Sequence, residues 1–132
     1  MGVIVDTNFF IAAERRRIAI DFSRWAEHGE AYISAITVSE LMLGVHLANS
    51  PQRRVQRNAF VEAIINRFPS LAFDAEVAKT HAQMRAAIPK QFTIGAHDLI
   101  VAATAMSRGF YVMTANEEEF GRIPGLKLLS VR

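Results

Sequence analysis

Two hydrophobic patterns alternate along the chain. Short runs rich in Val, Ile and other apolar residues are typical of buried strands, and longer stretches with apolar residues every three or four positions are typical of helices. Strands are expected at residues 3–5, 31–36, 70–74, 110–115 and 126–131. Helices are expected near 8–14, at 18–27, 37–50, 51–65, between Asp74 and Pro89 and at 97–109, with a helical turn at 116–123.

Residues that start and stop helices support these boundaries. Pro51 stands where a helix can begin, Asp74 can cap the next one, and Gly109 suits the position just after a helix end. Because strands alternate with helices, the expected fold is α/β: a mostly parallel sheet of about five short strands with helices on both faces. No linker or repeat divides the chain, so residues 1–132 are expected to form a single domain.

Several acids stand where strands end or helices begin. Asp6 closes the apolar run Val3–Val5, Glu40 lies in "TVSE", Asp98 opens an apolar helix, and Glu119 lies in "TANEEEF". In parallel α/β sheets, sites form outside the carboxyl ends of the strands. We therefore expect these acids to gather at one edge of the sheet.

Helix capping offers an alternative explanation for each acid. Thr37 and Glu40 match a capping box, and Asn116 with Glu119 matches a helix cap with its acid three residues on. Asp98 stands where a helix dipole favours an anion, and Asp6 could cap the helix near Asn8. Capping does not explain why an acid closes a buried apolar strand, nor why "HD" lies directly against "LIVAATA".

Clustered carboxylates repel one another unless a cation lies between them. Oxygen ligands suit Mg²⁺ or Mn²⁺, which support phosphodiester cleavage by activating water. The four histidines show no zinc-binding spacing: His46 and His81 fit a core or boundary, His28 fits the surface, and His97 beside Asp98 is a candidate phosphate contact. A receiver-like phosphoacceptor would need a suitably placed lysine, and none of the three lysines follows a core strand in that way.

Composition adds three constraints. The absence of cysteine excludes disulfides and thiolate chemistry, and no apolar stretch approaches membrane-spanning length. Net charge is only +2, but 12 of the 15 basic residues are arginines, whose planar forks suit phosphates. The clustered ones are candidates for RNA phosphates or, alternatively, simply solvated: Arg15, Arg16, Arg17, Arg53, Arg54 and Arg57.

Four segments in order carry a family resemblance. "VDTN", "TVSELMLGV", "GAHDLIVAATA" and "VMTANEEEF" resemble the motifs of PIN domains, and the chain is similar over essentially its whole length to the VapC toxins of type II toxin–antitoxin pairs. The resemblance implies a cytoplasmic, Mg²⁺- or Mn²⁺-dependent endoribonuclease that cleaves tRNA or rRNA. It also implies a homodimer that is silenced by a VapB-type antitoxin.

The resemblance also implies site residues. Asp6, Glu40 and Asp98 would be the metal-binding, catalytic carboxylates, with Glu119 completing the set, because Asn116 stands where many PIN domains carry Asp. Polar support would come from Thr7, Asn8, Thr114 and Asn116. The competing interpretation is a catalytically weak or inactive PIN-fold module that binds RNA or protein, with Asn116 marking lost chemistry.

Overall fold

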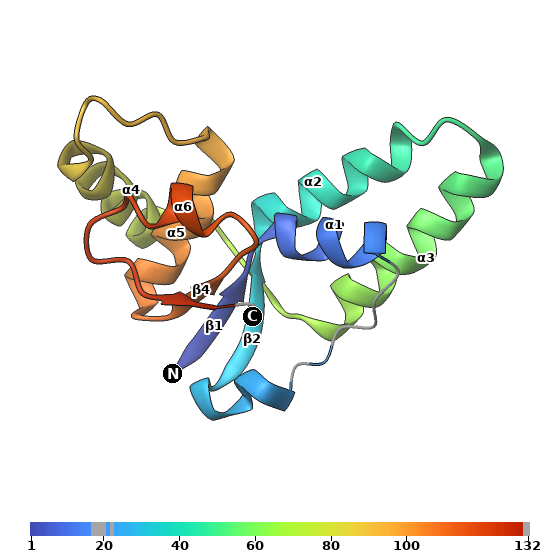
Figure 1. Ribbon diagram of the computed structural model, residues 1–132, viewed down its shortest axis with the longest axis horizontal. Coiled ribbons are helices and arrows are strands. Elements are labelled where there is room, and N and C mark those ends of the chain that lie inside the picture. Colours follow the sequence, from blue (N-terminus) through green and yellow to red (C-terminus); the bar gives the residue numbers. More distant parts are fainter. Residues whose placement is uncertain (17–20, 22, 131–132) are drawn as a thin grey trace.

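The computed structural model describes residues 1–16, 21 and 23–130. Strands and helices alternate as expected (Figure 1). In chain order they are β1 (Gly2–Val5), α1 (Thr7–Arg16), the 3-10 helix η1 (Ser23–His28), β2 (Glu30–Ser34), α2 (Ala35–His46), α3 (Pro51–Arg67), β3 (Ser70–Leu71), α4 (Ala75–Ala87), α5 (Ala96–Arg108), β4 (Tyr111–Met113), α6 (Glu117–Phe120) and β5 (Leu128–Leu129).

The described strands form one five-stranded sheet in the order β3-β2-β1-β4-β5. Every neighbouring pair is parallel, with Ile4 opposite Tyr32 of β2 and Val112 of β4. From β1 the chain builds outward in both directions, so the strand order reverses between β1 and β4. Such a reversal leaves a crevice at the carboxyl ends of the two strands.

Side chains of β1 alternate between two cores, as a strand buried on both faces requires. Val3 and Val5 pack in one core with α1, α2 and α3, whereas Ile4 packs in the other with α4 and α5. All three are at most 1% exposed. Figure 1 shows the same division, with α1–α3 on one side of the sheet and α4–α6 on the other. The expected α/β class with helices on both faces is confirmed.

Several expected boundaries need correction. The second strand ends at Ser34 and α2 begins at Ala35, because the Ser34 hydroxyl accepts a hydrogen bond from the Ile36 N–H and starts the helix there. The fourth strand stops at Met113, since the Thr114 hydroxyl accepts from the Asn116 N–H and turns the chain. The third and fifth strands are also shorter than expected, because each has only two residues.

The helix expected at 18–27 is only partly within the described residues. Residues 18–20 and 22 lie outside them, and the described part is η1, a 3-10 helix and not an α-helix. It ends at His28, and Gly29 follows with a φ of 103°; an added Cβ at Gly29 would lie 2.3 Å from the Met1 carbonyl oxygen. The positive φ and the close backbone approach both require glycine at this end.

No helix among the described residues is both long and apolar enough to cross a membrane.

Candidate functional site: acidic side chains at the carboxyl edge of the sheet

Asp6 lies at the strand-order reversal. It directly follows β1, and its N–H donates to the Met113 carbonyl of β4 over 2.9 Å. The carboxyl group is 1% exposed and accepts a hydrogen bond of 2.8 Å from the Thr114 hydroxyl. Thr114, fully buried at the end of β4, therefore holds the Asp6 carboxylate from the neighbouring strand.

Burial raises the pKa of Asp6 above its ordinary value. The Thr114 hydroxyl and the backbone N–H groups of Thr7 and Asn8 act in the opposite direction, while the negative charge of Glu40 adds to the rise. Asp6 thus caps α1 and also belongs to a group of interacting acids. The hydrogen bonds from Thr7 and Asn8 agree with the capping explanation, and the effect of Glu40 agrees with a group of interacting acids. That Asp6 binds a cation stays a prediction.

Asp98 and Glu119 meet beside the start of α5. The Glu119 carboxylate accepts from the Gly95 N–H over 2.7 Å and from the Asn116 side-chain amide. Asp98 and Glu119 are themselves joined by a side-chain hydrogen bond, which requires a proton on one of them. An added Cβ at Gly95 would lie 3.4 Å from Asp98 Oδ2, which is an ordinary contact, so the part that Gly95 plays here is that of its backbone N–H.

Asp98 has the higher pKa of this pair. Burial, which is the largest cause, and the charges of Asp6, Glu119 and Glu40 together raise its pKa from 3.8 to about 7. Burial also acts to raise the pKa of Glu119, but the Gly95 N–H, Asp98 and Asn116 outweigh it and hold that pKa below its usual range. Three acids from α2, α6 and the end of β1 are therefore within electrostatic range of Asp98.

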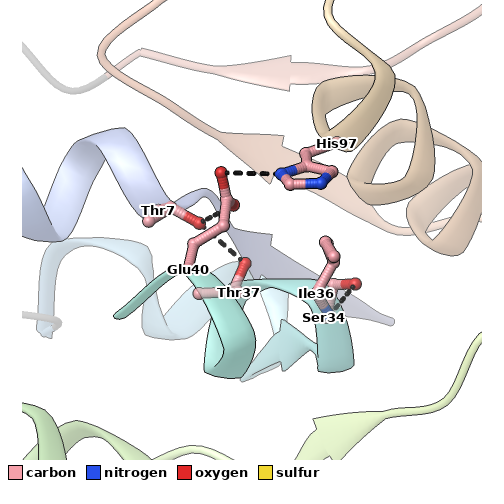
Figure 2. A network of polar contacts seen from close by, with 6 residues as sticks. All are labelled: Thr7, Ser34, Ile36, Thr37, Glu40 and His97. Atoms are coloured by element: carbon pink, nitrogen blue, oxygen red, sulfur yellow. Dashed lines mark hydrogen bonds and ion pairs between the residues drawn. The ribbon is translucent and has the colours of Figure 1, made fainter. Parts of the chain in front are cut away.

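Glu40 projects from α2 toward α1 and α5 (Figure 2). Its Oε1 accepts from the Thr7 hydroxyl over 2.7 Å, and its Oε2 lies 3.2 Å from Nδ1 of His97. The Thr7 hydroxyl lies 3.0 Å from that of Thr37, one helical turn before Glu40. Both carboxylate oxygens are therefore held by neighbouring elements.

The structure corrects the capping interpretation for two acids. Ser34 caps α2, so Thr37 and Glu40 do not form a capping box. Asn116 is at the N-cap position of α6 but its side chain makes no cap hydrogen bond; its amide donates to Glu119 instead. Asp98 does lie in the first turn of α5, where the helix dipole favours an anion.

The described arginines of the two clusters lie on α1 and α3, at different distances from the carboxylates. Arg15 and Arg16 are exposed in the last turn of α1, and Arg17 lies outside the described residues. Arg15 and Glu40 both line a cavity of about 190 Å³ between α1, α2 and α3. Arg53 and Arg54 are exposed in the first turn of α3, at the far end of the α2–α3 hairpin (Figure 1).

Two of the α3 arginines have partners in the chain. Arg57 lies 3.5 Å from Glu14 and donates to the Gly44 carbonyl, so it ties α3 to α1 and α2. Arg53 donates to the Asn49 side chain over 3.2 Å.

Sequence reasoning missed Thr37 and Gly95 as site residues. The signal for Thr37 was present in "TVSE", because residues three apart on a helix share a face. That spacing fitted a capping box equally well. Gly95 has no comparable signal, since its contact with Glu119 joins residues 24 positions apart.

The donor chemistry of this edge suits a hard divalent cation. Asp6, Asp98, Glu40 and Glu119 supply only oxygens, which Mg²⁺ and Mn²⁺ prefer. Among the described residues, no three acidic or histidine side chains already stand as a metal-binding group. Asp98 and Glu119 are instead joined by a hydrogen bond, and Glu40 is held by Thr7 and His97. A bound cation would supply a positive charge that offsets the repulsion among these acids.

The fold and the site are those of an α/β protein with interacting carboxylates at the strand-order reversal of a parallel sheet. Comparisons with known proteins show the family to which it belongs. The PIN domain model matches residues 3–126. Ribonuclease VapC1 of Rickettsia felis is 39% identical over 132 residues, covering 99% of this chain and 97% of that protein. The tRNA(fMet)-specific endonuclease VapC of Salmonella typhimurium is 38% identical over 97 residues, covering 73% of this chain and 71% of that protein.

A solved structure agrees with these relatives. DNA-bound VapBC from Salmonella typhimurium has a chain with a TM-score of 0.83 and 31% identity, covering 98% of this chain and 98% of that one. The chain therefore belongs to the PIN-domain family and, within it, to the VapC proteins.

Proposed function

We propose that the chain is a Mg²⁺- or Mn²⁺-dependent endoribonuclease and the toxin of a VapBC-type toxin–antitoxin pair. The observation that carries this proposal is the buried Asp6 at the strand-order reversal. The charge of Glu40 raises the pKa of Asp6, and the charge of Asp6 raises the pKa of Asp98. Its closely similar relatives named VapC ribonucleases support the choice of RNA as substrate.

Each side chain has a role in this proposal. Asp6, Glu40 and Asp98 would hold the cation, and Glu119, whose carboxylate accepts from the Asn116 amide, would complete the set of acids. When bound, the cation supplies an activated water and offsets negative charge that develops on the phosphate. Thr114 orients Asp6, and the Gly95 N–H orients Glu119, so two ligands are fixed by groups that do not themselves bind metal.

The proposed substrates are tRNA or rRNA. One relative is a tRNA(fMet)-specific endonuclease, which favours tRNA. Sequencing RNA 5′ ends after a brief induction of the protein in cells would identify the cleaved RNA. The cytoplasm is the proposed location, because its RNA and its reducing conditions fit a cysteine-free ribonuclease.

The proposed partner is a VapB-type antitoxin, and the proposed assembly of the toxin is a homodimer. The similar chain from Salmonella typhimurium was solved as VapBC. Leu43 of α2, Leu47 directly after α2 and Val55 of α3 are 55%, 71% and 70% exposed, as a protein contact would favour.

Asp6→Asn tests the proposed catalysis. The change keeps the shape of the side chain but removes a charged ligand, so cleavage of RNA in Mn²⁺ should fall by roughly 100-fold or more, in line with a lost metal ligand or its support. The measurement is cleavage of end-labelled RNA by purified protein, with EDTA abolishing the wild-type activity.

Asp74→Asn is the matched control. Asp74 caps α4 through the Val77 N–H and takes no part in the site, and Asn caps equally well. This variant should cleave like wild type. Equal activity of Asp6→Asn and wild type would refute the assignment, and a folded wild type with no metal-dependent cleavage would favour the inactive binding module.

A further inference from the structure

Thr37, Thr7 and Glu40 form a hydrogen-bonded series that joins α2 to α1 (Figure 2). Thr37 is 0% exposed and Thr7 is 3% exposed. Their hydroxyl oxygens are 3.0 Å apart, and the Thr7 hydroxyl lies 2.7 Å from Glu40 Oε1. The two threonines therefore form a buried, hydrogen-bonded pair that contacts one oxygen of the Glu40 carboxylate.

Counting protons gives this series a direction. A threonine hydroxyl carries one proton and a carboxylate can only accept. The proton of Thr7 therefore goes to Glu40, and Thr37 must donate its own proton to the Thr7 oxygen. Hydrogen bonds in such a chain polarise and strengthen one another, so Thr37 makes Thr7 a better donor to Glu40.

The carboxylate would otherwise be free to move. Glutamate has among the highest side-chain rotamer entropies, and three torsions separate the Glu40 carboxylate from its helix. On the side away from Thr7, its Oε2 contacts His97, whose side chain is 53% exposed. The buried hydroxyls are therefore the more rigid of its two supports.

We propose that Thr37 is a positioning residue that fixes the Glu40 carboxylate, through Thr7, in the orientation needed to hold a divalent cation. This inference rests on the proposed function, because it assigns Glu40 as a metal ligand. The plain structural alternative is that the Thr37 hydroxyl only fills and satisfies a buried position, with no effect on the site.

Three variants separate these explanations. Thr37→Val keeps the shape and removes the donor, Thr37→Ser keeps the donor and removes a methyl group, and Thr7→Val removes the direct bond to Glu40. Circular dichroism confirms folding. Titration calorimetry then measures Mn²⁺ affinity, and cleavage of end-labelled RNA is followed across Mn²⁺ concentrations.

Thr37→Val should weaken Mn²⁺ binding by roughly 3- to 10-fold, at or below the low end of the loss seen when groups that orient a ligand are removed. Its cleavage rate at saturating Mn²⁺ should stay close to that of wild type, because the chemistry itself is unchanged. Thr37→Ser should restore wild-type Mn²⁺ affinity, and Thr7→Val should lose at least as much as Thr37→Val.

Wild-type Mn²⁺ affinity in Thr37→Val would overturn the inference, and so would an equal loss in Thr37→Ser, which would point to methyl packing. If Thr37→Val does not fold, Thr7→Val decides: unchanged Mn²⁺ affinity overturns the inference and a weakened one supports it.

The inference and the proposed function can fail separately. If wild type shows neither Mn²⁺ binding nor cleavage, the proposed function falls, but a crystal structure of Thr37→Val still tests the positioning. A Glu40 carboxylate that has left Thr7 supports the inference, and an unmoved one overturns it.

Discussion

Asp6 satisfies two physical demands with one carboxylate. It accepts hydrogen bonds from N–H groups at the start of α1, which stabilises the helix, and it brings a negative charge within electrostatic range of Glu40 and Asp98. Burial makes that charge costly, as its raised pKa records. A residue that served only as a cap would stand in water, where the same hydrogen bonds carry no such cost.

The raised pKa of Asp98 should make the free energy of unfolding depend on pH. Its folded pKa of about 7 exceeds the ordinary value of 3.8, so the folded state binds the proton more tightly than the unfolded state does. In EDTA, the free energy of unfolding should therefore fall as pH rises from about 4 to about 7 and then level off. Because Asp98 is partly exposed, solvent screening moderates the size of this fall.

Asp98→Asn should remove most of that fall. In EDTA the variant should match wild type near pH 4 and exceed it in stability at pH 8, as measured by urea denaturation. Glu62→Gln, which neutralises an exposed acid of α3, is the matched control and should leave the pH dependence unchanged. A variant less stable than wild type by roughly 0.3–1 kcal/mol at pH 8 would instead indicate that Asp98 acts only on the helix dipole.

At the scale of elements, helix ends decide where the site groups stand. Ser34 starts α2 two residues earlier than expected, and this places Glu40 in the middle of the helix, where it faces Thr7 and His97. Gly95 brings the start of α5 against Glu119 of α6. Helices that start directly after β1 and β2 thus place Asp6 and Glu40, whereas Asp98 and Glu119 are placed by the contact between the start of α5 and α6.

Two glycines in helical segments should respond oppositely to alanine. Gly109 ends α5 with φ of 70°, so Gly109→Ala places a Cβ in the left-handed region and should cost roughly 1 kcal/mol of stability. Gly44 lies inside α2, and its added Cβ would meet only Arg57 Cδ at 3.6 Å. Gly44→Ala should therefore stabilise by roughly 0.5–1 kcal/mol.

Thermal denaturation of the two variants checks this pair. Each serves as the control for the other, because both add one methyl group to a glycine at or in a helix. A stabilised Gly109→Ala protein would contradict the left-handed helix end, and a strongly destabilised Gly44→Ala protein would contradict the open space beside α2.

At the scale of the whole molecule, the described members of both arginine clusters lie in α1 and α3, on one side of the sheet (Figure 1). Arg15 and Arg16 end α1 on the same side as α3, and Arg15 shares a cavity with Glu40. Single-stranded RNA that reaches the carboxylates across this side would pass the end of α1. Arg57 lines the same cavity but is held by Glu14 and Gly44, so we expect Arg15 and its neighbour Arg16 to neutralise phosphates near the site.

Changing Arg15 and Arg16 to Ala should weaken RNA binding and flatten its salt dependence. Each lost phosphate contact lowers the slope of log K against log salt by about 0.7 for single strands, so the slope should fall by up to about 1.4. Filter binding of Asp6→Asn protein at several salt concentrations avoids cleavage during the measurement.

The matched control changes Arg85 and Arg108 to Ala. Both are exposed, and they lie on α4 and α5, on the other side of the sheet. Net charge changes equally in the two double variants, so an equal effect on the salt slope would show that the α1 arginines have no specific role.

The sequence by itself determined the order of strands and helices and their parallel arrangement. Apolar periodicity and helix caps depend on only a few neighbouring residues. The sequence alone therefore predicts that Asp74 caps the start of α4 and that Gly109 ends α5. The same local logic indicated that Asp6, closing a doubly buried strand, needed a special explanation.

Only the tertiary structure decided which acids interact and through which partners. Thr114 and Asp6 are 108 positions apart and Gly95 and Glu119 are 24 apart, and no periodicity connects residues at such separations. For Thr37 and Glu40, local rules allowed either a capping box or a place in the acidic site. The structure excludes the capping box, because Ser34 caps α2 and Glu40 bonds to Thr7 on another helix. Contacts between elements depend on the packing of the whole sheet, because a hydrogen bond or a charge acts through space and not along the chain.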